Sequence, residues 1–435
     1  MDTAIISLII FGACVVLYIW NKLPVSVTAL LGLAAMLLFG VVSFSEGFKN
    51  FGSSTVVLIC GMMVVGKATF DTGLAQLIGN KVIALARGNE RLIVMLATAL
   101  TAIISAFLSN IATLAMMISI LTGVCAGNKN VRFKNVIMPV SIASVLGGAP
   151  TLIGSSTQLT AQGIVEEYLG ADKAFDFFTF SVPGFVIIIL LVLFVGYVGY
   201  PLGKKIWGES DGYNSVPGEE ANVKAEEAPN KDKMGVMTVI FVLTMVLYML
   251  CDTIKAYIPN FNVGLIALLS ALACVLTGCI SHKNALKSIN WTVAIWFCAS
   301  LGIAAGLNSS GGGAMLANAF IGLFGENIPV YGLYVVMVLL VMILTQFLSN
   351  STVLTIVLPV AFAITERMGC NTRSFAVGMT IAGAMAVATP LANTTIGMSM
   401  IADYKFSDYV KYCGPMTLIA FGVLITIVPL LFPLV

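Results

Sequence analysis

The stretch Phe107-Leu108-Ser109-Asn110 occurs twice, because Phe347-Leu348-Ser349-Asn350 repeats it letter for letter 240 positions later. Each copy lies in the middle of a long apolar run, at about 92–125 and about 330–364. Such a run is too long for one membrane crossing and short for two, since one crossing needs roughly 20 residues. Ser and Asn are favoured at helix N-termini. The pattern therefore predicts two short helical arms that meet at a polar tip.

The composition is that of a membrane protein. Apolar residues make up 59% of the chain and charged residues only 10%, whereas soluble domains carry roughly 25% charged residues. The net charge of +2 and the absence of a basic cluster with interleaved aromatic residues argue against a nucleic-acid partner. We therefore expect the lipid bilayer to surround most of the chain.

The cysteines and the single histidine, His282, do not form a cofactor motif. Nine cysteines are scattered, mostly inside apolar runs, and no Cys-x-x-Cys pair occurs. This pattern argues against a disulfide framework, a zinc site or a haem, and favours free buried thiols. No organic cofactor is expected.

The apolar segments follow the same order in two halves, 1–202 and 234–435. Each half has three spans, an amphipathic surface helix, the broken run, an interrupted span and a last span. The spans are expected at about 3–20, 25–43, 54–70, 136–168 and 180–202, and again at about 235–251, 262–280, 291–307, 374–402 and 415–433. The charged stretch 203–233 has the composition of a solvated linker.

The number of spans in each half decides how the halves are related. Five full spans are an odd number, so the second half enters the membrane from the opposite side. The predicted fold is an all-α polytopic membrane protein with two inverted repeats of five spans each and one re-entrant helical hairpin per repeat. Interrupted segments at matching places in inverted halves point to a transporter's binding site.

The distribution of Lys and Arg predicts the orientation. With the N-terminus outside, the inner loops hold Lys22, Lys81, Arg87, Arg91, Lys129, Arg132, Lys134, Lys204, Lys205, Lys283, Lys287, Lys405 and Lys411. The outer loops hold only Lys49, Lys173, Lys255, Arg367 and Arg373. The N-terminus has no basic region of a cleaved signal. We expect a multi-pass protein of the cytoplasmic membrane with both termini outside and the linker inside.

The chemistry of a tip suits a cation and an anion together. Carbonyls at the end of the first arm carry partial negative charge, and amides at the start of the second arm carry partial positive charge. Ser105 and Thr345 lie one turn before Ser109 and Ser349, so each pair of hydroxyls shares a helix face. Oxygen ligands suit sodium. The alternative reading is that these residues join helices by hydrogen bonds.

Lys67 and Asp71 lie at positions i and i+4 near the inner end of the third span, and the second half has no equivalent pair. One interpretation makes Lys67 a counter-charge for an anion or a proton-linked switch. The other is an ion pair whose side chains reach the membrane interface.

These residues resemble the divalent-anion/sodium symporter family of the ion transporter superfamily. That family has a Ser-Asn-Thr motif at each of two re-entrant tips and a Thr-Pro-Pro-Asn-like break in the span that follows. The tips here read Ser109-Asn110-Ile111 and Ser349-Asn350-Ser351. We align the breaks as Gly154-Ser155-Ser156-Thr157-Gln158 and Ala388-Thr389-Pro390-Leu391-Ala392-Asn393. Ile111 and Ser351 replace the motif threonines, so specificity is expected to differ there.

The resemblance implies the following site residues. One sodium site would use Ser105, Ser109, Asn110 and the backbone around Gly154. The other would use Thr345, Ser349, Asn350 and the backbone around Ala388. The anion would lie between the tips, at Ser109, Asn110, Ser349 and Asn350, with Ser351, Thr389 and Pro390 nearby. The family also implies a homodimer with an elevator-like movement of the hairpin-bearing domain.

The sequence thus predicts a sodium-coupled secondary transporter that imports a small anion, a di- or tricarboxylate, by alternating access. Sulfate or another oxyanion, and a proton-coupled or efflux member of the same superfamily, stay open as alternatives. An ion channel is an alternative of a different class, although two closed tips favour one occluded site over a continuous pore. An enzyme is not expected, because no nucleophile–base pair or His-based metal motif is evident.

Overall fold

The computed structural model describes residues 2–20, 22–127, 130–170, 172–207, 230–315, 318, 329–390 and 393–435. Within these residues the secondary structure is helical and contains no strand. The all-α membrane fold class is therefore confirmed. Most of the linker predicted at 203–233 lies outside the described residues.

The first half contains eleven α-helices, named here in chain order. They are α1 (Thr3–Trp20), α2 (Val25–Leu38), α3 (Phe44–Phe48), α4 (Ser54–Asp71), α5 (Leu74–Ala84), α6 (Glu90–Ser105), α7 (Asn110–Gly127), α8 (Phe133–Leu146), α9 (Ser156–Leu169), α10 (Ser181–Phe194) and α11 (Tyr200–Trp207). A 3-10 turn, η1 (Lys49–Gly52), precedes α4, and a π-helical turn, η2 (Val195–Gly199), joins α10 to α11.

The described part of the second half follows a similar order. Its helices are α12 (Met234–Met249), α13 (Cys251–Lys255), α14 (Val263–Leu276), α15 (His282–Ser288), α16 (Trp291–Ser309), α18 (Val330–Leu344), α19 (Asn350–Arg367), α20 (Thr372–Gly383), α21 (Thr394–Met398) and α22 (Phe406–Leu431). The 3-10 turns η4 (Lys231–Lys233) and η5 (Ser399–Ala402) precede α12 and follow α21. The amphipathic surface helix of the second half is predicted at 310–325, and residues 316–317 and 319–325 of it lie outside the described residues.

Both broken runs are interrupted where the sequence predicts. Helix α7 begins at Asn110 and α19 begins at Asn350. The interrupted spans also divide in two, as α8 with α9 and as α20 with α21. Ser349 occupies the N-cap of α19 but makes no side-chain cap hydrogen bond. Its hydroxyl is exposed and faces a cavity rather than the helix backbone.

Five continuous helical stretches in the described part of the chain are long and apolar enough to cross a membrane. They are Phe44–Asp71, Ser181–Trp207, Lys231–Met249, Trp291–Ser309 and Phe406–Leu431. Shorter apolar helices, including α1, α2 and α14, accompany them. The last span begins nine residues earlier than the predicted 415–433, because Asp408 accepts a hydrogen bond from the Lys405 amide and caps the helix start.

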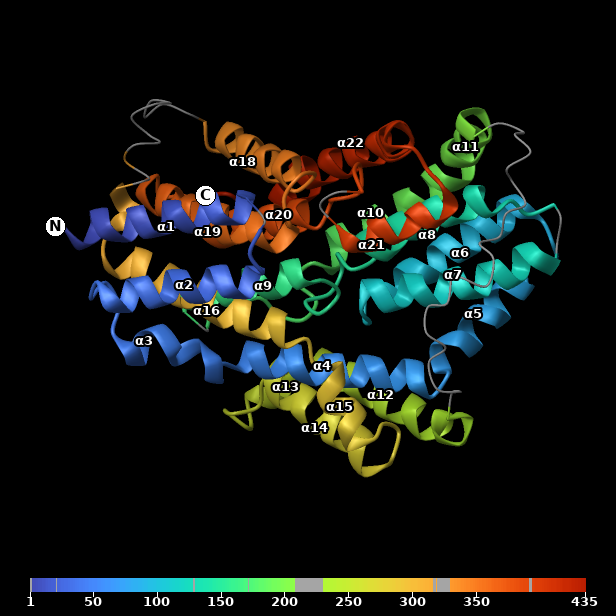
Figure 1. Cartoon of the computed structure of the whole chain (residues 1–435), viewed down its shortest axis with the longest axis horizontal. Coiled ribbons are helices and arrows are strands. Elements are labelled where there is room, and N and C mark those ends of the chain that lie inside the picture. Colours follow the sequence, from blue (N-terminus) through green and yellow to red (C-terminus); the bar gives the residue numbers. More distant parts are fainter. Residues whose placement is uncertain are drawn as a thin grey trace.

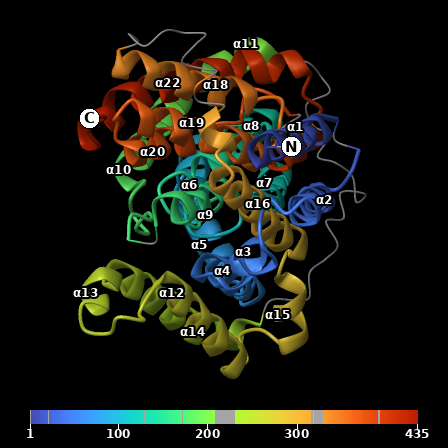
Figure 2. The ribbon, with the colours of Figure 1, turned by 90° about the vertical axis from the view of Figure 1, so that its left-hand side faces the viewer.

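The helices are arranged in layers around α9 (Figures 1 and 2). At one edge, α12 and α14 pack together and α14 lies along α4. The next layer holds α2 and α16, which contact each other closely. Helix α9 contacts α16 on one side and α19 and α20 on the other. The opposite edge is formed by α18 and α22 (Figure 2). Helix α9 thus joins the layers at the centre.

Small residues let α4 and α14 approach backbone to backbone. A Cβ placed on Gly61 would lie 2.8 Å from the carbonyl carbon of Ala267 and 2.9 Å from its Cβ. A Cβ on Gly264 would lie 3.0 Å from the Cα of Ser54. Small residues at such crossings are typical of membrane helices, which associate by close van der Waals packing.

We predict that Gly61→Val destabilises the protein by roughly 1–3 kcal/mol, because the new side chain has to push α14 away. The matched control is Gly235→Ala in α12, where no atom lies within 4 Å of the added Cβ. Thermal unfolding of the purified protein in detergent measures the effect. Equal melting temperatures for the two variants would contradict the packing described here.

Candidate functional site

At the first tip, a side-chain amide is held by groups from three segments. Ser105, the last residue of α6, is fully buried, and its Oγ donates to the Ser144 carbonyl of α8 at 2.5 Å. With its nitrogen turned inward, the Asn110 amide donates to Ser105 Oγ at 2.7 Å, to Ser144 O at 3.1 Å and to Gly154 O at 2.8 Å. The tip of one helix pair is thus tied to the break that follows it.

The second tip repeats this arrangement. Thr345 is fully buried, and its Oγ1 donates to the Gly383 carbonyl at the end of α20 at 2.8 Å. The same oxygen lies 3.0 Å from Asn350 Oδ1. The hydroxyls one turn before the Ser-Asn pairs, which the sequence singles out, therefore contact the Asn amides in both halves.

Two threonines attach the breaks to the tips. Thr151 Oγ1 donates to the Ala106 carbonyl in the first half, and Thr389 Oγ1 donates to the Gln346 carbonyl in the second. Thr151 and Thr389 thus make the same kind of contact in the two halves. Thr151 follows Pro150 and lies just before the stretch Gly154–Gln158 that the sequence predicts as the first break.

A glutamine amide stabilises the non-helical backbone of each break. Gln158 Nε2 donates to the carbonyls of Gly148 and Ala149 at 3.2 and 3.3 Å. In the second half Gln346 Nε2 donates to Met385 O, and Gln346 Oε1 accepts from the Ala388 amide, both at 3.0 Å. Non-helical backbone at membrane depth needs such partners.

The first break is also fixed by two glycines that pack against each other. A Cβ on Gly154 would lie 2.7 Å from the Cα of Gly148, and a Cβ on Gly148 would lie 2.9 Å from the Gly154 carbonyl carbon and 3.3 Å from Asn110 Oδ1. These neighbours are mostly backbone atoms, which cannot rotate away. Only glycine fits at either position.

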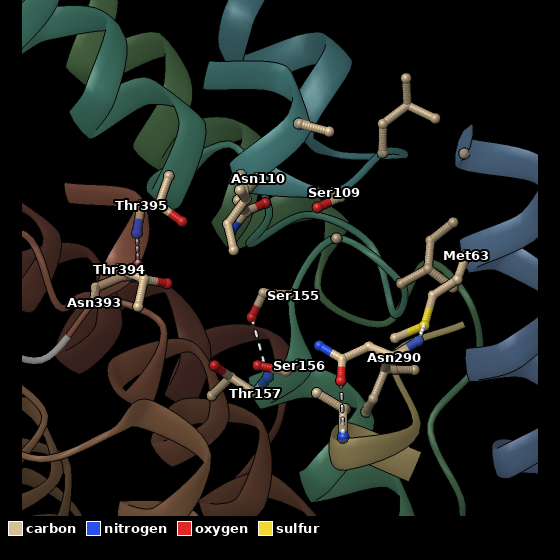
Figure 3. A pocket seen from close by; sticks show the side chains of 18 of the residues that line it. Met63, Ser109, Asn110, Ser155, Ser156, Thr157, Asn290, Asn393, Thr394 and Thr395 are labelled. Carbon is tan, nitrogen blue, oxygen red and sulfur yellow. Dashed lines mark hydrogen bonds between the residues drawn. The ribbon is translucent and has the colours of Figure 1, made fainter. Parts of the chain in front are cut away.

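The two tips share one cavity of about 1090 Å³, at the upper end of the roughly 300–1,000 Å³ typical of ligand pockets. Polar lining residues from the described part of the chain are Lys67, Gln76, Ser109, Asn110, Ser119, Ser155, Ser156, Thr157, Ser288, Asn290, Ser349, Asn350, Thr352, Asn393, Thr394 and Thr395. Figure 3 shows Ser109 and Asn110 facing Ser155–Thr157 across this space, with Thr394 and Thr395 beside them.

Several helices begin at this cavity. Residues lining it start α7 (Asn110), α9 (Ser156) and α19 (Asn350), and Asn290 caps α16, accepting from the Val293 amide at 3.3 Å. Because each helix start carries partial positive charge and unpaired N–H groups, the combined field favours an anion.

The predicted substrate residues divide into two groups. Ser109, Asn110, Ser349 and Asn350 line the cavity together, as does Gly154. Ser351, Thr389 and Pro390 are not among the lining residues: Ser351 Oγ donates to Ser156 Oγ at 3.0 Å. Two of the predicted ion ligands, Ser105 and Thr345, are fully buried and contact the Asn side chains of the tips.

Sequence reasoning missed the lining residues that follow the breaks. Ser156 and Thr157 open α9, and Thr394 and Thr395 open α21. Equivalent caps precede them, since Ser155 Oγ accepts from the Thr157 amide at 3.1 Å and Asn393 Oδ1 from the Thr395 amide at 2.9 Å. A polar capping residue directly after an apolar break was the available signal.

Thr157 carries an additional indication of a ligand. The side chain is fully buried, lines the cavity, and its Oγ1 has no hydrogen-bond partner among the described residues. Its methyl group lies near Gly383, the residue that accepts from Thr345. A buried hydroxyl without a partner loses free energy unless something else binds to it.

A profile of the family described as "Citrate transporter" (CitMHS) matches residues 15–382. This chain belongs to the citrate transporter family. It is therefore an integral membrane transporter, which supports the expectation that it is not an enzyme. Assignment to the divalent-anion/sodium symporters in particular stays a prediction.

Two relatives are similar to this chain along most of their length. An uncharacterized transporter of Haemophilus influenzae is 27% identical over 91% of this chain and 85% of its own length. The Drosophila melanogaster protein named "I'm not dead yet" is 24% identical, covering 79% of this chain and 70% of its own.

Two solved structures share the fold. The Alcanivorax borkumensis YdaH transporter superposes with a TM-score of 0.64 at 13% identity, covering 96% of this chain and 98% of that one. Neisseria gonorrhoeae MtrF, which is described as illuminating a class of antimetabolite efflux pumps, gives a TM-score of 0.56 at 14% identity, covering 91% of this chain and 84% of that one. At such low identity the likeness concerns the fold alone.

We predict that Gly154→Ala lowers the free energy of unfolding by roughly 1–3 kcal/mol, because its Cβ collides with the Gly148 backbone. Gly422→Ala in α22 is the matched control, since its Cβ meets no atom within 4 Å. Thermal melting of both variants measures the difference. A Gly154→Ala protein as stable as the control would show that the break is loosely packed.

Proposed function

We propose that this family member is a sodium-coupled secondary transporter that imports a small anion, a di- or tricarboxylate, by elevator-type alternating access. One observation supports this proposal above the others: α7, α9 and α19 all begin at one cavity, at polar residues from both halves of the chain. The family's description as citrate transporters agrees with a carboxylate substrate.

The anion would be held by neutral donors at the helix starts. Ser109 and Ser349 are exposed to the cavity, and Asn110 and Asn350 are half-buried there. Three other predicted residues do not line the cavity and would hold the tips in place: Ser351, Thr389 and Pro390. Donors fixed by helix geometry need little reorganisation when the ligand binds, which favours affinity.

Sodium would be held at the sites behind the tips. In the first half the candidate ligands are Ser105, Ser109, Asn110 and the Gly154 backbone; in the second they are Thr345, Ser349, Asn350 and the backbone near Ala388. The carbonyls of Ser144 and Gly154 meet at the Asn110 amide, and the Gly383 carbonyl meets the Thr345 hydroxyl, so oxygen atoms already converge at each proposed site. Oxygen-only ligation without a formal charge suits a monovalent cation at membrane depth.

Alternating access would follow from two inverted repeats, 1–202 and 234–435, with re-entrant hairpins at their tips. Matched contacts support this proposal: Ser105 corresponds to Thr345, Asn110 to Asn350 and Thr151 to Thr389. Helices α6–α9 and α18–α21 would move together against α1–α4 and α12–α16. We further propose a homodimer in the cytoplasmic membrane with both termini outside.

The first test is uptake of succinate, malate and citrate into proteoliposomes under an inward sodium gradient, compared with an equal potassium gradient. We expect uptake only with sodium. Uptake that is unchanged without sodium rejects the coupling. Uptake driven by a proton gradient instead would favour the proton-coupled alternative, and export against the same gradients would favour efflux.

We predict that Asn110→Ala and Asn350→Ala each reduce transport by roughly tenfold or more. Asn110→Ala removes an amide that joins the first tip to its break, and Asn350→Ala removes the contact with Thr345 across the second tip. Asn260→Ala, in an exposed loop, serves as the control. Initial rates of uptake at matched reconstitution levels measure the effect. Full activity in either tip variant rejects the assigned site.

We predict that Thr345→Val raises the sodium concentration for half-maximal uptake by roughly tenfold, because valine keeps the shape but removes the hydroxyl. Thr345→Ser should restore sodium affinity. Ser105→Ala should have a similar effect in the first half. A change in substrate KM with no change in the sodium requirement would place Thr345 in the anion site instead.

A further inference from the structure

Lys67 brings a full charge to the cavity. Among the described residues that line it, Lys67 has the only charged side chain. Helix α4 passes beside the first tip, since a Cβ placed on the neighbouring Gly66 would lie 3.9 Å from Leu108 Cδ2. Lys67 is therefore near the level of the tips and faces the cavity. An ionisable residue in such a position inside a membrane protein points to function.

Lys67 forms an ion pair with Asp71 whose order and position do not favour the stability of α4. The Lys67 ammonium lies 2.8 Å from Asp71 Oδ1, and the two side chains are 30% and 21% exposed. Asp71 is the last residue of α4, where a carboxylate meets the negative end of the helix dipole. A lysine four residues before an acidic residue is also the weaker order for an i,i+4 pair.

The pair is instead arranged to hold the ammonium in place. Asp71 is not among the lining residues, so it binds Lys67 from outside the cavity wall. An ammonium group has three N–H donors and can bind a ligand carboxylate while it remains paired with Asp71. Asp71 thus positions Lys67 at the cavity wall.

The residue after the first Ser-Asn pair has no side-chain donor for a ligand. Ile111, which follows Asn110, is 49% exposed and lines the cavity with an apolar side chain. The helix starts supply partial charges, whereas Lys67 supplies a full one. The cavity of about 1090 Å³ is large enough for a ligand that reaches from the tips to α4.

We propose that Lys67 is a specificity-determining residue that binds the second anionic group of a substrate whose first carboxylate lies at the two tips. This inference rests on the proposed function and names its substrate class as anions with two or more carboxylates. Asp71 is the positioning residue that keeps the ammonium directed into the cavity.

Succinate and butyrate provide the test, because both have four carbons but only succinate has a second carboxylate. Affinities are measured by ligand-induced thermal shift and by competition with uptake, in the wild type, Lys67→Gln and Lys67→Arg. We expect Lys67→Gln to reduce the affinity for succinate by roughly tenfold or more, because the variant loses a hydrogen bond to a charged group. We expect butyrate affinity and the sodium requirement to stay unchanged, and Lys67→Arg to retain much of the succinate affinity.

A double variant, Lys67→Gln with Asp71→Asn, guards against misfolding, because it leaves no uncompensated carboxylate behind. It should melt near the wild-type temperature and still lose the preference for succinate over butyrate. The single variant Asp71→Asn should keep part of that preference, since the ammonium remains but is less well positioned.

Three outcomes would overturn the inference. If Lys67→Gln keeps wild-type succinate affinity while Asn110→Ala abolishes transport, the proposed function stands and Lys67 is only structural. If Lys67→Gln reduces the affinities for succinate and butyrate equally, Lys67 attracts anions in general and does not recognise a second carboxylate. If the wild type binds neither succinate nor citrate, the carboxylate substrate class fails, and the inference fails with it.

Discussion

The structure depends on one buried hydrogen-bonded junction that occurs in each half of the chain. A hydroxyl at the end of a helix, Ser105 in α6 or Thr345 after α18, donates to a carbonyl near the C-terminus of α8 or α20 and contacts an Asn amide across the turn. Helix ends leave backbone carbonyls without partners inside the helix. The junction provides side-chain partners for some of them, and so holds the end of α6 against α8 and the end of α18 against α20.

Because the junctions hold the helix ends, the helix starts are free to face the cavity. Asn110, Ser156 and Asn350 each open a helix there, and Ser156 and Ser351 connect the two halves directly. The two sides of each tip thus differ. The carbonyl oxygens lie at the buried junction, whereas the N–H groups of the helix starts face the cavity.

The sequence was sufficient for the order of the helices and for the two tips. The FLSN repeat located the starts of α7 and α19, because a Ser-Asn pair inside an apolar run has few other structural explanations. It was insufficient for Thr151, which follows Pro150 outside the stretch predicted as the first break, and for Ser156, Thr157, Thr394 and Thr395. The last four residues open α9 and α21, and their places at the cavity depend on tertiary contacts of α9 with α19 and of α21 with α7 and α8. The orientation, the repeat relationship and the sodium sites stay predictions.

The contact between Gly148 and Gly154 has a consequence for the choice of cation. Two backbones packed directly against each other have no side chain that could shift to let a carbonyl advance or retreat. The Gly154 oxygen, which receives a hydrogen bond from Asn110, is therefore held at a nearly fixed distance from its neighbours. A sodium ion at the proposed site would meet a cage of set diameter. Discrimination between alkali metals would then come from the stiffness of two glycines rather than from any charged ligand.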